Sequence, residues 1–244
     1  MSACGSVRVL VTGFGPFPGI PHNASASLVL ALEKSAAAFL PGLSIAAAIV
    51  PVVWGQARAA LREAASRFKP DAILHFGVSK RVSGFEIETR ALNISGPKED
   101  HAGAIRPEAP LVPAGSPVLM ATLPPSHLLG TLKRGGFPAA LSGDAGRYLC
   151  NALFYWSLSD AGAEGPLVSF VHIPALGVAG EAEPRLTMEE AVAGARILVR
   201  ASAEAVLRAK QNGLSQGGGN GHGSQTFYGN GRNGGRSFGG NSGC

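Results

Sequence analysis

The sequence Leu43-Ser-Ile-Ala-Ala-Ala-Ile-Val-Pro-Val-Val53 predicts a buried strand, because small and β-branched apolar residues follow one another without a polar face. A helix is predicted next, from Gln56 to Phe68, and Pro70 prevents it from continuing. The following apolar run, Asp71-Ala-Ile-Leu-His-Phe-Gly77, predicts a second buried strand. A strand, a helix and a strand in succession are typical of a sheet with helices packed on its faces.

The same alternation continues in both directions along the chain. Val7-Arg-Val-Leu-Val-Thr12 predicts an earlier strand, followed by a helix from Ser25 to about Ala37. Further strands are predicted over residues 118–123 and 167–174. We therefore expect the α/β class, as a single three-layer α/β/α domain with a mostly parallel twisted sheet. Loops at the carboxyl ends of such strands usually form the site.

The C-terminal part predicts two more helices and then a change of character. A short helix is expected from Pro125 to about Arg134, and Thr187-Met-Glu-Glu190 has the capping-box pattern that opens a helix to about Lys210. Residues 211–244 are rich in Gly, Asn and Ser, and such a composition buries too little apolar surface to fold. We expect a domain over residues 1–210 and a disordered tail over residues 211–244.

The charge pattern argues against a nucleic-acid partner. The net charge is only +5, and Lys and Arg are scattered over the domain without a basic stripe. In the tail, Gly231-Arg-Asn-Gly-Gly-Arg-Ser-Phe-Gly-Gly240 is similar to the arginine-glycine segments of some RNA-binding proteins. Only Arg232 and Arg236 are cationic there, so few phosphates would be neutralised, and a flexible appendage without a partner is the preferred interpretation.

No membrane partner, metal or cofactor is expected either. No apolar run approaches the ~18 residues of a membrane span, and the first residues lack the basic and apolar regions of a signal peptide, so a cytoplasmic location is expected. The three cysteines are Cys4, Cys150 and Cys244, which suggest neither a disulfide framework nor the ligand spacing of a zinc site.

The first strand leads into a loop with three glycines, Gly13-Phe-Gly-Pro-Phe-Pro-Gly19. A phosphate-binding turn must open directly into a helix, whereas Pro16 and Pro18 keep this loop extended until about Asn23 or Ser25. We therefore exclude a dinucleotide site. Phe14 and Phe17 in this loop suit an apolar ligand, although packing on the core explains them equally well.

Cys150 lies in the stretch Ser142-Gly-Asp-Ala-Gly-Arg-Tyr-Leu-Cys-Asn-Ala-Leu-Phe-Tyr-Trp156, which predicts a turn followed by a helix. Ser142 and Asp144 are both good N-cap types. A thiol early in a helix lies near the positive end of the helix dipole, which favours a reactive thiolate. The alternative is an inert core cysteine, and these residues alone leave it open.

Two further segments carry candidate partners for the thiol. Leu167-Val-Ser-Phe-Val-His-Ile-Pro174 places His172 near the end of a strand, where a core histidine is the alternative. Phe85-Glu-Ile-Glu-Thr-Arg-Ala-Leu-Asn-Ile94 alternates, and it predicts an exposed strand with Glu86, Glu88 and Arg90 on one face, where solvated charges are the alternative. The segment from Ser95 to Pro117 predicts a long loop, of the kind that often forms a lid or binding segment.

From about Val7 to Lys210, the chain resembles pyroglutamyl-peptidase I, a family of cysteine peptidases also called pyrrolidone-carboxylate peptidases. The resemblance is carried by separated segments in the family's order: Val11-Thr-Gly-Phe-Gly-Pro-Phe-Pro-Gly19 with Asn23-Ala-Ser25, Ile87-Glu-Thr-Arg-Ala-Leu-Asn-Ile94, Ala145-Gly-Arg-Tyr-Leu-Cys-Asn151, and Phe170-Val-His-Ile-Pro174. It implies removal of N-terminal pyroglutamyl residues from peptides through an acyl-enzyme, without a cofactor. It also suggests a homotetramer, which nothing in the sequence itself establishes.

The resemblance also implies a role for particular residues. Cys150 would be the nucleophile, His172 its base and Glu88 the group that orients His172. The slot for the lactam ring would be formed by Phe14, Phe17, Tyr148 and Leu149, with tyrosine at the position where the family usually has phenylalanine.

Two departures from the family pattern favour a second hypothesis. Gly77-Val-Ser-Lys80 lacks the family's glutamine, and Lys98 stands where the family's oxyanion-stabilising arginine is expected. Losing an oxyanion donor typically lowers the rate by ~10² to 10³. The alternative is therefore a degenerate relative that binds peptides or blocked amino termini without hydrolysing them.

Overall fold

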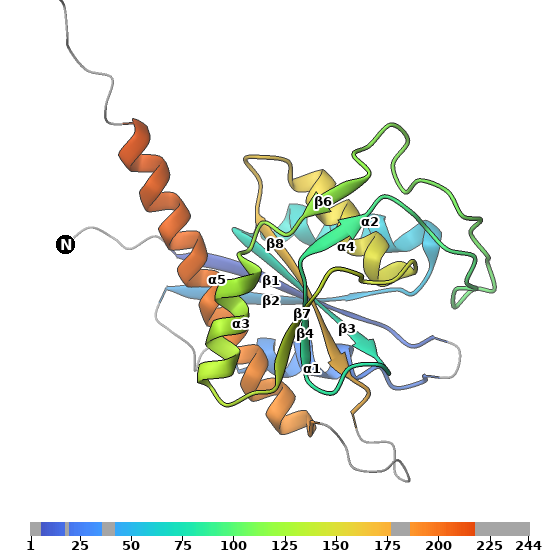
Figure 1. Cartoon of the computed structure of the whole chain (residues 1–244), viewed down its shortest axis with the longest axis horizontal. Coiled ribbons are helices and arrows are strands. Elements are labelled where there is room, and N and C mark those ends of the chain that lie inside the picture. Colours follow the sequence, from blue (N-terminus) through green and yellow to red (C-terminus); the bar gives the residue numbers. More distant parts are fainter. Residues whose placement is uncertain (1–5, 18–19, 36–41, 177–185, 218–244) are drawn as a thin grey trace, which may run out of the picture.

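The structure, a computed structural model, describes residues 6–17, 20–35, 42–176 and 186–217. Its centre is a six-stranded sheet with the strand order β2-β1-β3-β8-β4-β7 (Figure 1). The strands are β1 (Val7–Phe14), β2 (Leu43–Val50), β3 (Ala72–Ser79), β4 (Phe85–Glu88), β7 (Ala139–Ser142) and β8 (Leu167–Pro174). Strands β2, β1, β3 and β8 are parallel to one another, whereas β4 is antiparallel to β8 and parallel to β7. The predicted α/β class with a mostly parallel sheet is confirmed.

Helices cover both faces of the sheet and give the molecule three layers (Figure 1). One face carries α1 (Ala24–Lys34), α3 (Pro125–Arg134) and α5 (Met188–Gly217), and the other carries α2 (Trp54–Phe68) and α4 (Leu149–Ala161). Each face has its own apolar core, with Leu28, Leu128 and Leu198 in the first and Leu61 and Phe154 in the second. The periodic burial of these side chains against the sheet is the main stabilising term for the helices.

The predicted exposed strand over residues 85–94 is wrong in two respects. The segment divides into β4 and a short β5 (Arg90–Leu92), which pairs with β6 (Val118–Met120) in a separate two-stranded sheet. The alternation itself is real, but β4 lies inside the main sheet between β8 and β7, so Phe85 and Ile87 enter the core and Glu88 is fully buried. On the polar face of β4, Glu88 is therefore enclosed by the protein, whereas Glu86 is half-buried.

The predicted turn followed by a helix is observed, but neither of the N-cap candidates Ser142 and Asp144 caps the helix. Ser142 ends β7, a strand that the sequence analysis missed, and α4 begins only at Leu149. The Ser142 hydroxyl accepts from the Asp144 N–H at 3.1 Å, and the Asp144 carboxylate accepts from the Gly146 N–H at 3.0 Å. Both side chains stabilise turns two residues ahead, which is the other common use of residues that cap helices.

The last helix begins as predicted and is longer than predicted. Thr187 and Glu190 form the expected capping box, with the Glu190 N–H donating to Thr187 Oγ1 at 3.1 Å and the Thr187 N–H donating to Glu190 Oε2 at 2.8 Å. The helix continues past Lys210, whose Nζ is paired with Asp71 at 2.8 Å, and ends at Gly217. Residues 211–217, predicted as the start of the disordered tail, are part of this helix, so the predicted boundary at residue 210 is wrong. Residues 218–244 lie outside the described residues, so their disorder and the lack of a nucleic-acid partner stay predictions. Among the helices described, none is long and apolar enough to span a membrane.

Candidate active site

Cys150 is the second residue of α4, as expected for a thiol early in a helix. The N-cap residue of α4 is Tyr148, whose backbone is extended and whose side chain makes no capping hydrogen bond. The first N–H groups of a helix have no acceptor within the helix, and they lie at the positive end of its dipole. The start of α4 therefore presents hydrogen-bond donors beside a thiol.

Asn151 fixes the start of α4 in place. Its side chain is fully buried and accepts from the Leu92 N–H at 2.8 Å. It also donates to the carbonyl oxygens of Leu92 at 2.9 Å and Ile94 at 3.1 Å. These bonds join α4 to β5 and so position the neighbouring thiol. The sequence analysis assigned no role to Asn151, although a carboxamide in an apolar helix next to the candidate nucleophile was the available signal.

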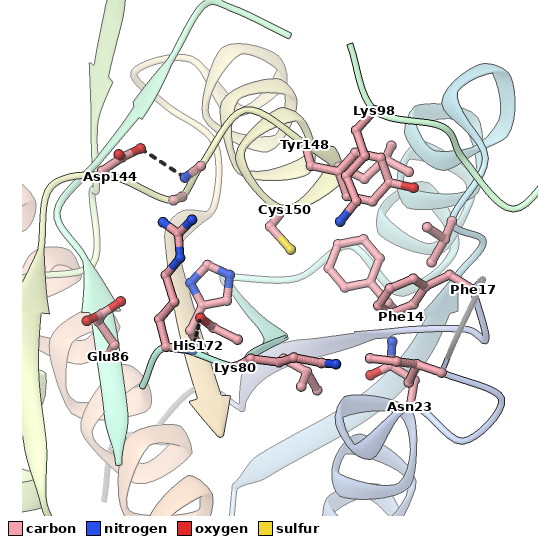
Figure 2. A pocket seen from close by; sticks show the side chains of 18 residues that line it. Phe14, Phe17, Asn23, Lys80, Glu86, Lys98, Asp144, Tyr148, Cys150 and His172 are labelled. Carbon is pink, nitrogen blue, oxygen red and sulfur yellow. Dashed lines mark hydrogen bonds between the residues drawn. The ribbon is translucent and has the colours of Figure 1, made fainter. Parts of the chain in front are cut away.

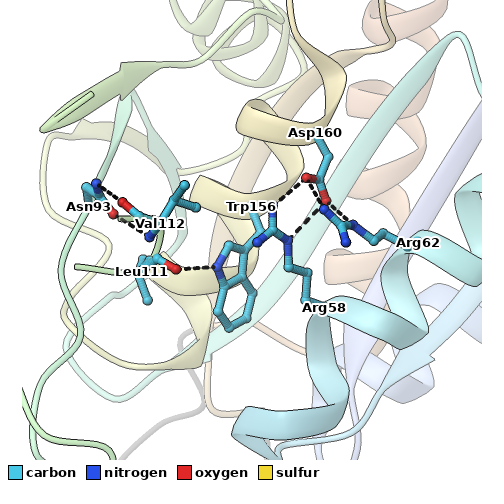
Figure 3. A network of polar contacts seen from close by, with 7 residues as sticks. All are labelled: Arg58, Arg62, Asn93, Leu111, Val112, Trp156 and Asp160. Carbon is cyan, nitrogen blue, oxygen red and sulfur yellow. Dashed lines mark hydrogen bonds and ion pairs between the residues drawn. The ribbon is translucent and has the colours of Figure 1, made fainter. Parts of the chain in front are cut away.

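The far end of α4 is attached to α2 (Figure 3). Asp160 accepts from Arg58 at 2.6 Å and from Arg62 at 2.7 Å. Burial by itself raises the pKa of Asp160, but the hydrogen bonds and charges of the two arginines outweigh it and hold this pKa below its usual value. The Trp156 indole donates to the Leu111 carbonyl oxygen at 3.5 Å and so joins α4 to the long loop. The helix that carries Cys150 is thus held at both ends.

His172 and Glu88 form a buried pair beneath the thiol. The Nδ1 atom of His172 lies 2.8 Å from Glu88 Oε1. His172 is only 6% exposed and Glu88 is fully buried, so water screens this pair little. The pair joins β8 to β4, in which Glu88 is opposite Phe170 and Glu86 is opposite His172.

The environment of His172 favours its protonated form. Burial by itself lowers the pKa of His172, but hydrogen bonds to Cys150 and Glu88, and the charges of both groups, raise it to about 10. In Figure 2 the sulfur of Cys150 points toward the His172 ring. A thiol beside an imidazole, with a carboxylate hydrogen-bonded behind the ring, is an arrangement that activates a cysteine nucleophile.

Gly77 leaves the space that this arrangement needs. It is the register partner of His172 on the neighbouring strand β3. A Cβ atom at this position would lie 3.2 Å from Cys150 Sγ and 2.8 Å from the Phe170 ring. A side chain here would displace the thiol or the ring, so the site depends on a glycine at this position.

A cavity of about 550 Å³ opens above Cys150 and His172 (Figure 2). The predicted residues Phe14, Phe17, Lys98, Tyr148 and Leu149 all line it together with the thiol and the imidazole. Glu88 is the exception, because it lies behind His172 rather than in the cavity wall. The structure therefore brings together all the residues that the sequence analysis singled out for the site.

The aromatic end of the cavity is built on a braced loop after β1. The Asn23 amide donates to the Gly15 carbonyl oxygen at 3.0 Å, and the Phe14 N–H donates to Ser25 Oγ at 3.0 Å. A Cβ atom at Gly13 would lie 2.4 Å from the Ser25 carbonyl oxygen, so glycine allows α1 to approach the end of β1. The helix starts at Ala24, within the predicted range of Asn23 to Ser25.

Lys98 and Tyr148 meet at the rim of this aromatic end. The Lys98 ammonium lies 4.5 Å from the centre of the Tyr148 ring, a cation–π distance. The Tyr148 hydroxyl donates to the Glu99 carbonyl oxygen at 2.9 Å. Burial, followed by the nearby charges of Asp100, Cys150 and Glu99, raises the pKa of Tyr148 to about 12, so the phenol stays protonated. The long loop thus contributes Lys98 to the cavity, as expected of a binding segment.

Asp100 holds this part of the long loop in shape. Its carboxylate accepts from the Trp54 N–H at 2.8 Å and from the N–H groups of Ala102 and Ala104 at 2.9 and 3.0 Å. Burial by itself raises the pKa of Asp100, but these three backbone donors outweigh it and lower the pKa below its usual value. Asp100 therefore fixes the loop two residues beyond Lys98.

Four charged residues in the cavity wall were not assigned to the site from the sequence: Lys80, Arg81, Glu86 and Asp144. Burial raises the pKa of Glu86, and the charge of Glu88 adds to this effect. The alternation of β4 placed Glu86 on the same face as Glu88, which was the signal for its position. Nothing in the sequence pattern placed Lys80 and Arg81, which follow the end of β3.

Glu86, Glu88 and His172 each offer one ligand atom within 4.8 Å of the others, a grouping that a metal ion could use. Carboxylate and imidazole are common ligands for transition metals. A metal ion at this position would compete for the Glu88 and His172 atoms that form the 2.8 Å hydrogen bond. Metal binding and the activated thiol are therefore alternatives at this site.

Comparison with known proteins identifies relatives over most of the chain. The profile of the family described as Pyroglutamyl peptidase matches residues 7–207. The pyrrolidone-carboxylate peptidase of Pyrococcus furiosus is 34% identical over 176 residues, which are 69% of this chain and 81% of the relative. That of Vibrio vulnificus is 31% identical over 209 residues, covering 84% of this chain and 97% of the relative.

Solved structures agree with the sequence matches. The crystal structure of pyroglutamyl peptidase I from Bacillus amyloliquefaciens is similar with a TM-score of 0.76 and 28% identity, over 81% of this chain and 97% of that one. Sequence and fold therefore point to the same group of proteins. The chain belongs to the pyroglutamyl peptidase family of cysteine peptidases.

Proposed function

We propose that the protein removes N-terminal pyroglutamyl residues from peptides, with Cys150 as nucleophile, His172 as acid and base, and Glu88 as the group that orients His172. The observation that carries the proposal is that Cys150 and His172 line the same cavity with aromatic walls, while Glu88 holds His172 from behind through a 2.8 Å hydrogen bond. The names of the relatives support the substrate class.

The aromatic end of the cavity suits the pyroglutamyl ring. This ring is a flat five-membered lactam, which offers two weakly polar faces and one amide edge. Phe14, Phe17 and Tyr148 supply aromatic surface, and Leu149 supplies aliphatic surface. Aromatic side chains bind flat apolar ligands with little loss of conformational freedom. Asn23 also lines this end, but its amide is already bonded to the Gly15 carbonyl oxygen.

In the first half-reaction, the Cys150 thiolate attacks the carbonyl carbon of the peptide bond that follows the pyroglutamyl residue. The electron pair of this C=O bond moves to the oxygen. The N–H groups at the start of α4 and the Lys98 ammonium on the rim stabilise this oxyanion. When the tetrahedral intermediate collapses, the C–N bond breaks and the His172 imidazolium gives its proton to the leaving amine. The products are a free amino terminus and a thioester at Cys150.

In the second half-reaction, neutral His172 takes a proton from water as the water oxygen attacks the thioester carbonyl. Collapse of this intermediate breaks the C–S bond and releases pyroglutamate with the regenerated thiolate and imidazolium. Glu88 keeps the ring in the orientation that both transfers need, because it holds Nδ1 and leaves Nε2 for the reaction. Each proton that His172 gives in the first half is recovered in the second.

The competing proposal is a protein that binds blocked amino termini without hydrolysing them. Val78 lines the cavity where the family has a glutamine, and Lys98 stands in for an arginine. Against this proposal, the thiol and the imidazole line the same cavity, and the imidazole keeps its hydrogen bond to the carboxylate. We therefore favour hydrolysis. A homotetrameric assembly and a cytoplasmic location stay predictions.

The proposal is tested with a chromogenic pyroglutamyl amide and the full-length chain. We expect release of the chromophore by the wild type and at least a ~10³-fold lower rate for Cys150→Ser. The double variant Cys4→Ser/Cys244→Ser is the matched control, because it retains only the proposed nucleophile and should keep the wild-type rate. Equal rates for wild type and Cys150→Ser would refute the mechanism. Tight binding of the amide without turnover would establish the competing proposal.

A further inference from the structure

A second cavity of about 430 Å³ adjoins the first. It lies beside the strands β4 and β7, and its lining includes Arg81, Ser83, Glu86, Lys133, Phe137 and Ala140. Arg81 and Glu86 line both cavities, so these two side chains mark the boundary between them. The site described above uses only the first cavity and leaves the second without a role.

The position of His172 sets the direction in which a peptide substrate extends. In Figure 2 the rings of Phe14 and Tyr148 lie on one side of Cys150 and Glu86 lies on the other, with His172 between. If the pyroglutamyl ring occupies the aromatic end, the leaving nitrogen must face His172, which protonates it. The rest of the peptide then continues past His172 toward Glu86, which is opposite His172 in the β4–β8 register.

The two side chains at the boundary between the cavities offer the hydrogen-bond groups that a peptide backbone needs. Glu86 is half-buried and offers a hydrogen-bond acceptor, whereas Arg81 is exposed and offers donors. In the described part of the chain, no ion pair joins either side chain to another residue. A peptide group carries one N–H donor and one C=O acceptor, so a backbone passing between them satisfies both. A small chromogenic amine offers neither group beyond the scissile bond.

We propose that the second cavity binds the leaving peptide, whose backbone passes between Arg81 and Glu86 and whose second and later residues occupy the space beside Ser83 and Phe137. This inference rests on the proposed function, because it takes the leaving nitrogen to lie at His172. The ligand class is an extended peptide with at least two residues beyond the pyroglutamyl residue. Such substrates are preferred over pyroglutamyl amides of single amino acids or small amines.

The test compares a short and a long substrate, pyroglutamyl-alanine amide and pyroglutamyl-alanyl-phenylalanyl-alanine amide. Both end in an amide, so they do not differ in charge. For the wild type we expect kcat/KM to be at least tenfold higher for the longer peptide. The variant Ser83→Trp places an indole in the second cavity, and it should reduce the ratio of the two kcat/KM values to about one. Ser66→Trp, at an exposed position on α2, is the matched control and should keep the wild-type ratio.

The outcomes separate the two proposals. Hydrolysis of both peptides with equal kcat/KM, or an unchanged ratio in Ser83→Trp, overturns the second cavity as a peptide site and leaves the proposed function standing. If Ser83→Trp does not fold, Ala140→Trp fills the same cavity from β7. If the wild type hydrolyses neither peptide, the proposed function is wrong. Calorimetric titration then tests the second cavity as a peptide-binding site without cleavage. The longer peptide should bind at least tenfold more tightly and Ser83→Trp should abolish the difference, whereas equal affinities overturn the inference.

Discussion

Two histidines on neighbouring strands of the same sheet differ in the charge that they carry. His75 on β3 is fully buried, and burial lowers its pKa to about 3. His172 on β8 is 6% exposed, yet its hydrogen bonds to Cys150 and Glu88 outweigh burial and raise its pKa to about 10. The register pairs His75 with Phe170 and Gly77 with His172, so the two rings lie only one pleat apart.

The pKa values of the two histidines differ because their hydrogen-bond partners differ, and not because one ring is more deeply buried. His75 Nδ1 lies 2.7 Å from the Thr12 hydroxyl, a neutral group, and its Nε2 has no hydrogen-bond partner in the structure. His172 Nδ1 lies 2.8 Å from a buried carboxylate. A buried histidine with a neutral partner stays neutral and serves the core, whereas one with a carboxylate and a thiol becomes an imidazolium ready to transfer a proton.

The largest expected effect comes from removing the His172 ring, and removing the His75 ring provides the comparison. His172→Ala should lower kcat by ~10² to 10⁴, because both proton transfers lose their carrier. His75→Asn should keep kcat within about twofold of the wild type, because this side chain does not reach the cavity. Steady-state kinetics with a pyroglutamyl amide checks both. If kcat fell by a similar factor in both variants, His75 would contribute to activity as much as His172, and the distinction between the two histidines would be wrong.

The next effect concerns the charge of Glu88. Glu88→Gln keeps an oxygen that accepts from Nδ1 but removes the negative charge, so the pKa of His172 should fall by ~1 to 3. Activity that depends on the imidazolium is present below this pKa and is lost as the pH rises through it, near pH 10 in the wild type. We expect the alkaline limb of the kcat/KM profile to move to lower pH and kcat to fall by ~10². An unmoved limb would assign the high pKa to another group.

A third prediction concerns the pH dependence of stability. The pKa of His75 is lowered, whereas that of His172 is raised. Because folding lowers the pKa of His75, below pH 6.5 the unfolded chain binds a proton that the native state does not, and stability falls as the pH falls from 6.5 toward 3. Between pH 7.5 and pH 5, this residue should cost about 2 kcal/mol of unfolding free energy. Urea unfolding of wild type and His75→Asn at the two pH values measures it. The variant should lose about 2 kcal/mol less than the wild type, and equal losses would show that His75 is not buried in its neutral form.

Sequence reasoning recovered the parts of the fold that depend on local patterns. The strand over residues 167–174 and the helix from Pro125 to Arg134 were predicted with the observed bounds, because apolar period and proline position act within a few residues. Where the burial of a strand depends on pairing with a segment distant in sequence, the local pattern was insufficient to predict it. The first part of the exposed strand predicted at residues 85–94 is β4, a buried strand inside the main sheet, because β7 covers its edge. β7 is a short and polar-ended segment that was not recognised.

The candidate site shows the same division. Cys150, His172 and Glu88 were named from the resemblance, since residue types and spacing alone left each with a structural alternative. Asn151 and Asp100 were not assigned roles, because each makes a hydrogen bond to a backbone group distant in sequence. A carboxamide or carboxylate that bonds to backbone groups about 50 residues away leaves no periodic signal in the chain.

The smallest expected effect comes from Phe170, the fully buried ring that contacts both histidines, with ring centres 6.0 Å from His75 and 4.8 Å from His172. Phe170→Leu should lower the unfolding free energy by about 1 to 2 kcal/mol, because a smaller side chain leaves part of the core unfilled. Activity should fall less than ~10-fold, because Glu88 still holds His172 in place. Thermal unfolding and kcat of the same preparation check both values. Phe154→Leu is the control, because the ring of this core residue lies against Phe170, with ring centres 5.9 Å apart. Phe170→Leu would contradict this prediction if it lost as much activity as Glu88→Gln while Phe154→Leu did not. In that case, packing against the Phe170 ring orients the His172 imidazole together with the Glu88 carboxylate, and this one side chain connects the surroundings of the two histidines.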